Sequence, residues 1–239
     1  MVSKNQRKQI QQLNQKKYRQ LLGKFVAEGE KVVNEILNAG WKFDFLLAQN
    51  PELYQQALPV DALTMRQLTH FSTPSSVLGV FEIPTPSEFQ KEPVIIALEG
   101  IRDPGNLGTI IRMCDWFGIE QVICSSDTVD CFNAKVVQAT MGSIVRVKCH
   151  YVEDFETFIK TLQLPIVGAD TNGASLYKEG LPQSGVFVFG NEAHGISKKT
   201  IAVLDQKLAI PNFSKGEKAE SLNVAMATSI FLSEIFRSK

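Results

Sequence analysis

The chain has 239 residues, of which 44% are hydrophobic and 21% are charged, as is usual for globular proteins. Its formal net charge is zero, which by itself neither favours nor excludes nucleic acid as a partner. The sequence contains no uninterrupted apolar run that could span a membrane and no secretory signal, so we expect a cytoplasmic protein without a membrane partner.

Basic residues are concentrated at the start of the chain. The first 24 residues hold seven lysines and arginines and no acid. Such an arm can bind the phosphate backbone of a nucleic acid, and a solvated terminus without a partner is the alternative. The predicted RNA-binding residues of this arm are Arg7, Lys8, Lys16, Lys17 and Arg19.

The region up to the proline-rich stretch reads as an α/β layer of its own. Residues 15–40 predict a helix, a turn near Gly23, a short extended piece and a second helix that ends at Gly40. Residues 41–49 predict a strand. Residues 82–93 contain Pro84, Pro86 and Pro93 and form the expected linker.

After the linker, short apolar runs alternate with helical segments. This pattern predicts a largely parallel sheet that is covered on both faces. The predicted strands are residues 94–100, 121–126, 144–152, 165–170, 185–190 and 207–212, and a long apolar helix is expected over residues 220–237. Ligands of such sheets bind beyond the carboxyl ends of the strands, and several of these ends are rich in glycine, asparagine or carboxylates.

The four cysteines do not form a CxxC pair, and their spacing fits neither a zinc site nor a disulfide framework. We therefore expect reduced thiols and no metal.

Residues 99–118 (EGIRDPGNLGTIIRMCDWFG) look at first like a phosphate-binding turn that leads into a helix. However, the sequence lacks GxxxxGK[ST], and Gly105 and Gly108 give only GxxG instead of GxGxxG. Asn106 or Thr109 is the expected helix cap. In the helix, Arg112 is predicted to point away from the apolar face, towards solvent, a ligand or another subunit.

At this point the residues resemble the SpoU (TrmH-like) RNA 2′-O-ribose methyltransferases of the SPOUT superfamily. Three motifs occur in the family's order: Asn106-x-Gly108-x-x-x-Arg112, then GNEAHG at residues 190–195, then Ile210-Pro211 with Ser221-Leu222-Asn223. Residues 24–37 also resemble the family's L30e-like substrate-binding domain. The resemblance implies an RNA-binding domain over residues 1–86 and a catalytic domain over residues 93–239. It also implies a Rossmann-like parallel sheet with a C-terminal trefoil knot.

The resemblance further implies that a methyl group is transferred from S-adenosylmethionine to a ribose 2′-hydroxyl of transfer or ribosomal RNA. It assigns catalytic roles to Arg112, Asn106, Glu192 and Asn223, and it places Gly190, Ile210, Leu222 and Asn223 against the cofactor. A homodimer that forms through the catalytic domain is expected.

The individual roles stay open at this stage. Arg112 is either a general base or a clamp that holds a phosphate and the emerging alkoxide, and the clamp is favoured because a guanidinium is a poor base. Glu192 is expected to orient Arg112 or Asn106, and Asn106 either holds the ribose or only caps the helix. Ser221 is a possible cap of the last helix, and we regard His194 as incidental.

Two other classes of protein remain. One is a non-catalytic RNA-binding protein that keeps the fold, which the presence of all four catalytic residues disfavours. The other is a Rossmann enzyme for a small molecule, which the absent glycine fingerprints and the basic arm disfavour.

Overall fold

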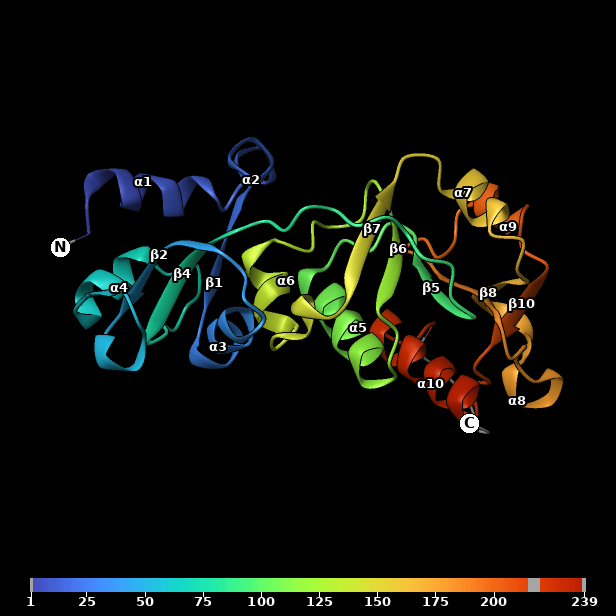
Figure 1. Ribbon diagram of the computed structural model, residues 1–239. Coiled ribbons are helices and arrows are strands. Elements are labelled where there is room, and N and C mark those ends of the chain that lie inside the picture. The colour runs from blue at the N-terminus through green and yellow to red at the C-terminus, as the bar shows by residue number, and fades with distance from the viewer. Residues whose placement is uncertain (1, 215–219, 238–239) are drawn as a thin grey trace. The chain divides into compact units, whose positions relative to one another are not determined.

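The computed structural model describes residues 2–214 and 220–237, and it divides into two compact units by its contacts (Figure 1). Unit 1 consists of the residues up to Ser87 together with Asp130–Val145. Unit 2 consists of Glu88–Val129 and the residues from Arg146 onward. The sequence-based division had placed residues 130–145 in the catalytic domain.

Unit 1 is built on a four-stranded sheet in the order β1-β4-β2-β3. Its strands are β1 (Lys24–Glu28), β2 (Phe43–Ala48), β3 (Ala57–Pro59) and β4 (Val77–Glu82). Its helices are α1 (Lys4–Gln12), α2 (Lys16–Leu22), α3 (Glu30–Asn38), α4 (Ala62–Leu68) and α6 (Ala134–Ala139), with the short 3-10 helices η1 (Pro51–Leu53) and η2 (Ser143–Val145). Strand β4 is antiparallel to both of its neighbours, whereas β2 and β3 are parallel.

Both faces of this sheet are buried, because alternate residues of each strand enter different cores. On one face, Phe25 and Leu46 pack with Val33 of α3. On the other face, Val26 and Leu47 pack with residues of α1 and α4. Helix α2 ends at Leu22, and Gly23 adopts the left-handed conformation at its C-cap, so the predicted turn is confirmed.

Residues 130–145 complete the core of unit 1. The ring of Phe132 lies 5.0 Å from that of Phe25 and 6.4 Å from that of Trp41. Val137 of α6 is fully buried in the same cluster. The strand expected over residues 144–152 therefore begins only at Lys148, since residues 143–145 form η2 in unit 1.

Unit 2 contains a six-stranded, fully parallel sheet in the order β10-β8-β9-β5-β6-β7. Its strands are β5 (Val94–Leu98), β6 (Gln121–Ser125), β7 (Lys148–Val152), β8 (Ile166–Ser175), β9 (Gly185–Phe189) and β10 (Gln206–Ala209). Its helices are α5 (Pro104–Trp116), α7 (Phe155–Thr161), α8 (Leu176–Glu179), α9 (Lys198–Ile201) and α10 (Val224–Phe236). The predicted parallel sheet is confirmed.

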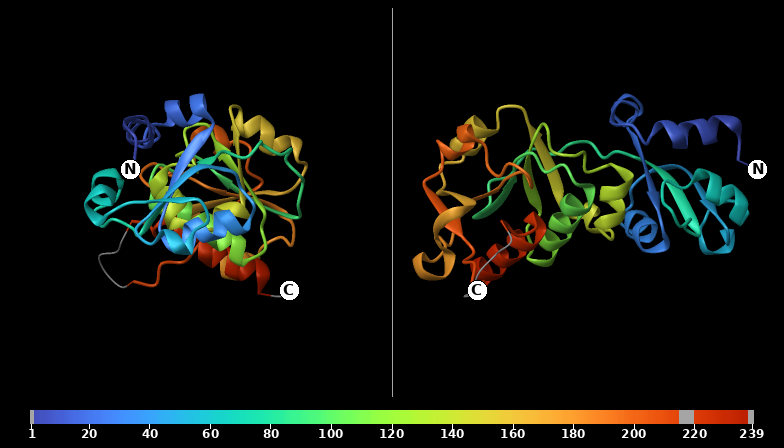
Figure 2. Two further views of the ribbon diagram at one scale, coloured as in Figure 1. Left: turned by 60° about the vertical axis from the view of Figure 1, so that its left-hand side comes forward. Right: turned by 180° about the vertical axis from the view of Figure 1, so that it is seen from behind.

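The unit 2 sheet is also covered on both faces, which explains its uniformly apolar strands. Ile95 and Val188 pack with Phe155 of α7 on one face. On the other face, the rings of Phe189 and Phe231 of α10 lie 5.4 Å apart. Helices α5 and α10 lie side by side, as Figures 1 and 2 show, and the rings of Phe117 and Phe236 join their ends.

Candidate active site

The candidate site lies at the carboxyl edge of the unit 2 sheet, near the point where the strand order reverses. Strands β5 and β9 are direct neighbours there, yet the chain continues from β5 to β6 on one side and reaches β9 only later. Parallel α/β sheets bind ligands in the crevice at such a switch point. Asn106 lies in the first turn of α5, which follows β5, and the loop after β9 carries Glu192.

Helix α5 begins differently from our expectation. Its N-cap is Asp103, whose carboxylate accepts a hydrogen bond of 2.8 Å from the backbone N–H of Asn106, and Pro104 occupies the first turn. Neither Asn106 nor Thr109 is the cap. Because Asp103 performs this role, the side chain of Asn106 is available for other contacts.

The Asn106 side chain joins two of the other predicted catalytic residues. Its Nδ2 donates to Glu192 Oε1 over 3.0 Å, and its Oδ1 accepts from Asn223 Nδ2 over 2.8 Å. We call Glu192, Asn106 and Asn223 the polar chain. Of the two partners considered for Glu192, the structure shows Asn106.

Asn223 also caps α10. Its Oδ1 accepts hydrogen bonds from the backbone N–H groups of Ala225 and Met226. The cap is therefore Asn223 and not Ser221, and the helix begins four residues later than expected. The Asn223 amide is fixed at both ends, which orients the polar chain.

The GNEAHG motif forms a tight loop after β9. Asn191 and Gly195 exchange two backbone hydrogen bonds, and Asn191 Oδ1 accepts from the N–H groups of Ala193 and His194. A Cβ atom on Gly190 would collide with the backbone of Gly195 and Ile196. Only glycine fits there, so the motif glycine has a steric reason in this fold.

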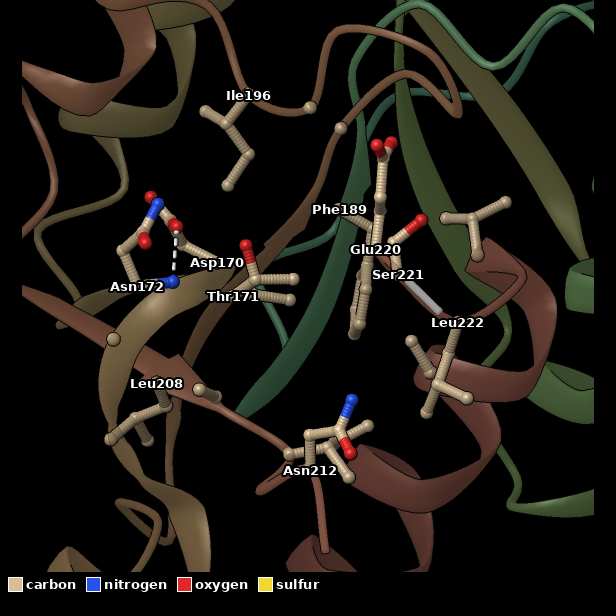
Figure 3. A pocket seen from close by; sticks show the side chains of 18 of the residues that line it. Asp170, Thr171, Asn172, Phe189, Ile196, Leu208, Asn212, Glu220, Ser221 and Leu222 are labelled. Atoms are coloured by element: carbon tan, nitrogen blue, oxygen red, sulfur yellow. Dashed lines mark hydrogen bonds between the residues drawn. The ribbon is translucent and has the colours of Figure 1, made fainter. Parts of the chain in front are cut away.

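A pocket of about 1200 Å³ opens beside this loop (Figure 3). Four segments line it: residues 169–175 of β8, the loop after β9, residues 208–214, and the chain that leads into α10. In Figure 3, Asp170, Thr171 and Asn172 lie across the opening from Phe189, Ser221 and Leu222. Four residues were predicted to contact the cofactor, and three of them line this pocket: Gly190, Ile210 and Leu222.

These three residues are suited to binding a ligand through hydrogen bonds from their main-chain groups. Within the part of the chain that the structure describes, the main-chain groups of Gly190, Ile210 and Leu222 form no hydrogen bond. Leu222 is also half-exposed, so it is not an ordinary core residue. Unsatisfied amide and carbonyl groups on the wall of a pocket are suited to hydrogen-bonding a ligand.

The pocket is also acidic. Asp170, Glu192 and Glu220 all line it. Asp170 has a counter-ion, because Lys207 Nζ lies 3.5 Å from its carboxylate. The remaining carboxylates favour a ligand that carries positive charge.

Arg112 projects outward from α5, as predicted, and does not line the pocket. It forms no hydrogen bond or ion pair with any residue in 2–214 or 220–237. Trp116 lies one helical turn further along the same face, and its side chain is 85% exposed. The structure does not bring Arg112 to the polar chain within one copy of the protein.

The basic arm requires one correction. Arg19 is only 2% exposed. Its Nε and Nη2 both lie 2.7 Å from Asp130 Oδ2, and its Nη1 donates to the carbonyl groups of Leu13 and Asn14. Arg19 is thus a buried structural residue, unavailable to RNA. Lys8, Lys16 and Lys17 are exposed, and Arg7 is half-buried with a hydrogen bond to Gln67.

Several functional details were absent from the sequence-based prediction. Asp103 as the helix cap and Arg102 beside it were not identified, although the Asp-Pro pair is a recognisable helix-start signal. Across the described ranges, no cluster of three or more metal-ligand side chains occurs, and no helix is both long and apolar enough to cross a membrane.

Comparison with known proteins finds a family model for each of two parts of the chain. A model of the SpoU rRNA Methylase family matches residues 93–233, and a model of the MRM3-like substrate binding domain matches residues 4–79. The 23S rRNA (guanosine(2553)-2′-O)-methyltransferase RlmP of Bacillus subtilis (strain 168) is 29% identical over 250 residues, which cover 96% of each chain.

Solved structures match along the whole chain. A protein of the TrmH family from Porphyromonas gingivalis is 34% identical, with a TM-score of 0.87 and complete coverage of both chains. An AdoMet-bound rRNA methyltransferase from Sinorhizobium meliloti is 30% identical, with a TM-score of 0.84, and the match covers 100% of this chain and 97% of that one. The chain belongs to the SpoU rRNA methylase family.

Proposed function

We propose that this protein transfers the methyl group of S-adenosylmethionine to a ribose 2′-hydroxyl of ribosomal RNA. The observation that carries the proposal is the pocket beside the polar chain: unpaired backbone groups of Gly190, Ile210 and Leu222 lie on its wall. The names of the relatives support the substrate class, since RlmP is a 23S rRNA 2′-O-methyltransferase. Residues 93–239 would form the catalytic domain, and residues 1–86 would bind the RNA.

The proposed cofactor fits the acidic pocket. Gly190, Ile210 and Leu222 would hold it through main-chain groups, and the carboxylates of the pocket would face its positive charges. When bound, the cofactor supplies an electrophilic methyl group. We also place the family's trefoil knot in the C-terminal part of the chain, and we expect the protein to act in the cytoplasm.

The residues of the polar chain would position the ribose. Methyl transfer needs the 2′-oxygen in line with the methyl carbon, and it needs its proton removed. Asn106 is held from both sides, by Glu192, which lines the pocket, and by Asn223, so its amide is pre-oriented. Arg112 would grip an RNA phosphate and stabilise the developing alkoxide, because a guanidinium stays protonated and donates in pairs.

A second copy of the chain would bring Arg112 to the pocket. Arg112 and Trp116 share one exposed face of α5, and Met226 is 58% exposed on the neighbouring α10. A large exposed indole is a typical anchor of a protein interface. We therefore propose a homodimer through α5 and α10.

The interface has a direct test. Trp116→Glu is expected to convert the dimer into a monomer in light scattering, because a charge would be buried in an apolar interface. Leu63→Glu is the matched control, since Leu63 is exposed on α4 of unit 1. A wild-type protein that is monomeric at all concentrations would contradict the shared site.

The activity is tested by comparing 2′-O-methylated nucleosides in RNA from cells with and without the gene. The proposal predicts the loss of a single methylation in ribosomal RNA. A loss in transfer RNA would redirect the substrate, and no loss at all would favour the non-catalytic RNA-binding alternative.

A further inference from the structure

The loop between β5 and α5 is fastened on both sides. On one side, the N–H of Gly100 donates to Ser125 Oγ over 2.8 Å, and the N–H of Ile101 donates to Thr128 Oγ1 over 3.3 Å. On the other side, Asn191 Nδ2 donates to the carbonyl oxygen of Gly100 over 2.7 Å. Ile101 is fully buried. The backbone of this loop is therefore rigid.

Arg102 is the next residue of this loop, and its side chain behaves differently. It is 72% exposed, and its one interaction among the described residues is with Asp127, whose Oδ2 lies 4.0 Å from its Nη2. The carboxylate of Asp127 is itself 58% exposed. An ion pair so exposed and so long contributes little to stability. The fold thus holds the Arg102 backbone in place while its guanidinium is nearly free.

The position of Arg102 relates it to the proposed chemistry. It directly precedes Asp103, which caps α5, and it lies four residues before Asn106 of the polar chain. Residues 99–106 contain no other lysine or arginine. A cation is thus carried by the rigid loop that leads into the first turn of α5, where Asn106 lies, at the carboxyl edge of the sheet.

Asp127 gives this cation a preferred direction. Ser125 Oγ donates a 2.6 Å hydrogen bond to Asp127 Oδ1, which fixes the carboxylate at the end of β6. The other oxygen, Oδ2, faces Arg102. A guanidinium held loosely in this way can exchange a distant carboxylate for a phosphate that it can bind with two parallel hydrogen bonds.

We propose that Arg102 binds a phosphate of the RNA backbone next to the target ribose. The inference rests on the proposed function and adds a substrate-binding residue outside the three family motifs. Arg102 would hold the nucleotide in register with the polar chain, from the same copy of the protein that supplies Asn106. It would contact the backbone only and would therefore not select the base.

The test is steady-state kinetics with ribosomal RNA isolated from cells that lack the gene. Arg102→Ala is expected to raise the KM for this RNA about 10-fold and to reduce the slope of log affinity against log salt by about one unit. Binding of S-adenosylmethionine, measured by calorimetry, is expected to stay unchanged. Arg102→Lys keeps the charge without the paired donors, so it is expected to restore the salt slope and only part of the KM.

Two further variants separate phosphate binding from a structural role. Asp127→Asn keeps the acceptor for Ser125 and removes the ion pair. If Arg102 acted only through that ion pair, this variant would raise the KM as Arg102→Ala does; phosphate binding predicts no increase. Lys160→Ala removes an exposed charge on α7 and controls for net charge.

The outcomes are distinct. An Arg102→Ala variant with wild-type KM and salt slope, in a preparation whose wild-type enzyme is active, overturns the inference and leaves the proposed function standing. A wild-type enzyme that neither binds S-adenosylmethionine nor methylates the RNA overturns the proposed function itself.

Discussion

Arg19 in α2 and Arg112 in α5 were both predicted to contact RNA, and they lie in opposite environments. Arg19 is buried and bonded to Asp130 and to two carbonyl groups. Arg112 is exposed and has no polar partner in the described part of the chain. Whether an arginine has a partner within the protein decides its role more than its neighbours in sequence do.

The contrast also separates the two units. In unit 1, a charge of the basic arm holds residues 130–145 against the core. In unit 2, the guanidinium of Arg112 has no polar partner among the described residues, and that of Arg102 has only a distant one in Asp127. A buried charge that is neutralised by the protein stabilises the fold, whereas an exposed, unpaired guanidinium is available to a substrate.

The largest expected effect is on catalysis by Arg112. Arg112→Met should reduce the rate of methyl transfer by roughly 10³-fold, because the developing alkoxide loses its charged donors. Binding of S-adenosylmethionine and the free energy of unfolding should stay as in the wild type. Single-turnover transfer of a radiolabelled methyl group measures the rate, and full activity would contradict the assigned role.

The matched change in unit 1, Arg19→Met, should lower the stability of the protein, whereas Arg112→Met lowers the rate of methyl transfer. Arg19→Met leaves Asp130 without its cation, which should lower the free energy of unfolding of unit 1 by about 3 kcal/mol. Urea unfolding followed by the fluorescence of Trp41, in a Trp116→Phe background, measures it. Arg112→Met is the control, because it makes the same change at an exposed arginine and should leave the free energy of unfolding unchanged. A loss of RNA affinity without a loss of stability would show that Arg19 does contact RNA.

A smaller effect is expected from the polar chain. Asn106→Ala removes the link between Glu192 and Asn223 and should lower the rate of methyl transfer by about 10- to 100-fold, with the RNA affinity little changed. Asp103 still caps α5 in this variant, so the melting temperature should hold. If the rate stays at the wild-type level, Asn106 has no role in positioning the ribose.

The smallest effect concerns the pH dependence of unit 1. Burial lowers the pKa of His70 below 6.5, and the positive charge of Arg19 lowers it further. The folded state then binds fewer protons than the unfolded state, so stability should be lost as the pH falls from 6.5 through the folded pKa. Arg19→Met should reduce this loss of stability at low pH, because it removes the positive charge that helps to lower the pKa of His70.

His70→Gln serves as the reference for this measurement. Its melting temperature should fall less than that of the wild type between about pH 7.5 and about pH 5.5. The comparison isolates His70 from Glu28, whose pKa is raised by burial and whose contribution has the opposite sign. Identical curves for the two proteins would contradict the assignment.

Much of the fold could be predicted because local patterns carry it. Strands β5, β6 and β9 are continuous apolar runs, as burial on both faces requires. Two features of the fold were not predicted from the sequence. Helix α1 is strongly polar and is anchored by Ile10, and residues 130–145 join the core of unit 1 through contacts such as that between Phe132 and Phe25. Contacts between residues so far apart in sequence leave no local signal.

The part of the site that consists of motif residues could be predicted from the sequence. The pocket contains Gly190, Ile210 and Leu222, and the polar chain joins Asn106, Glu192 and Asn223. Spacing could not reveal that Asp103 replaces Asn106 as the cap, since both residues are good caps. The burial of Arg19 was equally hidden, because its partner Asp130 lies far along the chain.

The central claim is that the pocket of unit 2 serves methyl transfer to a ribose oxygen. The most direct measurement incubates the purified protein with methyl-labelled S-adenosylmethionine and ribosomal RNA from cells that lack the gene, then maps the label. We predict that it lies on the 2′-oxygen of a single nucleotide, and that Arg112→Met incorporates almost none. Label on a base, or equal incorporation by the variant, would contradict the account.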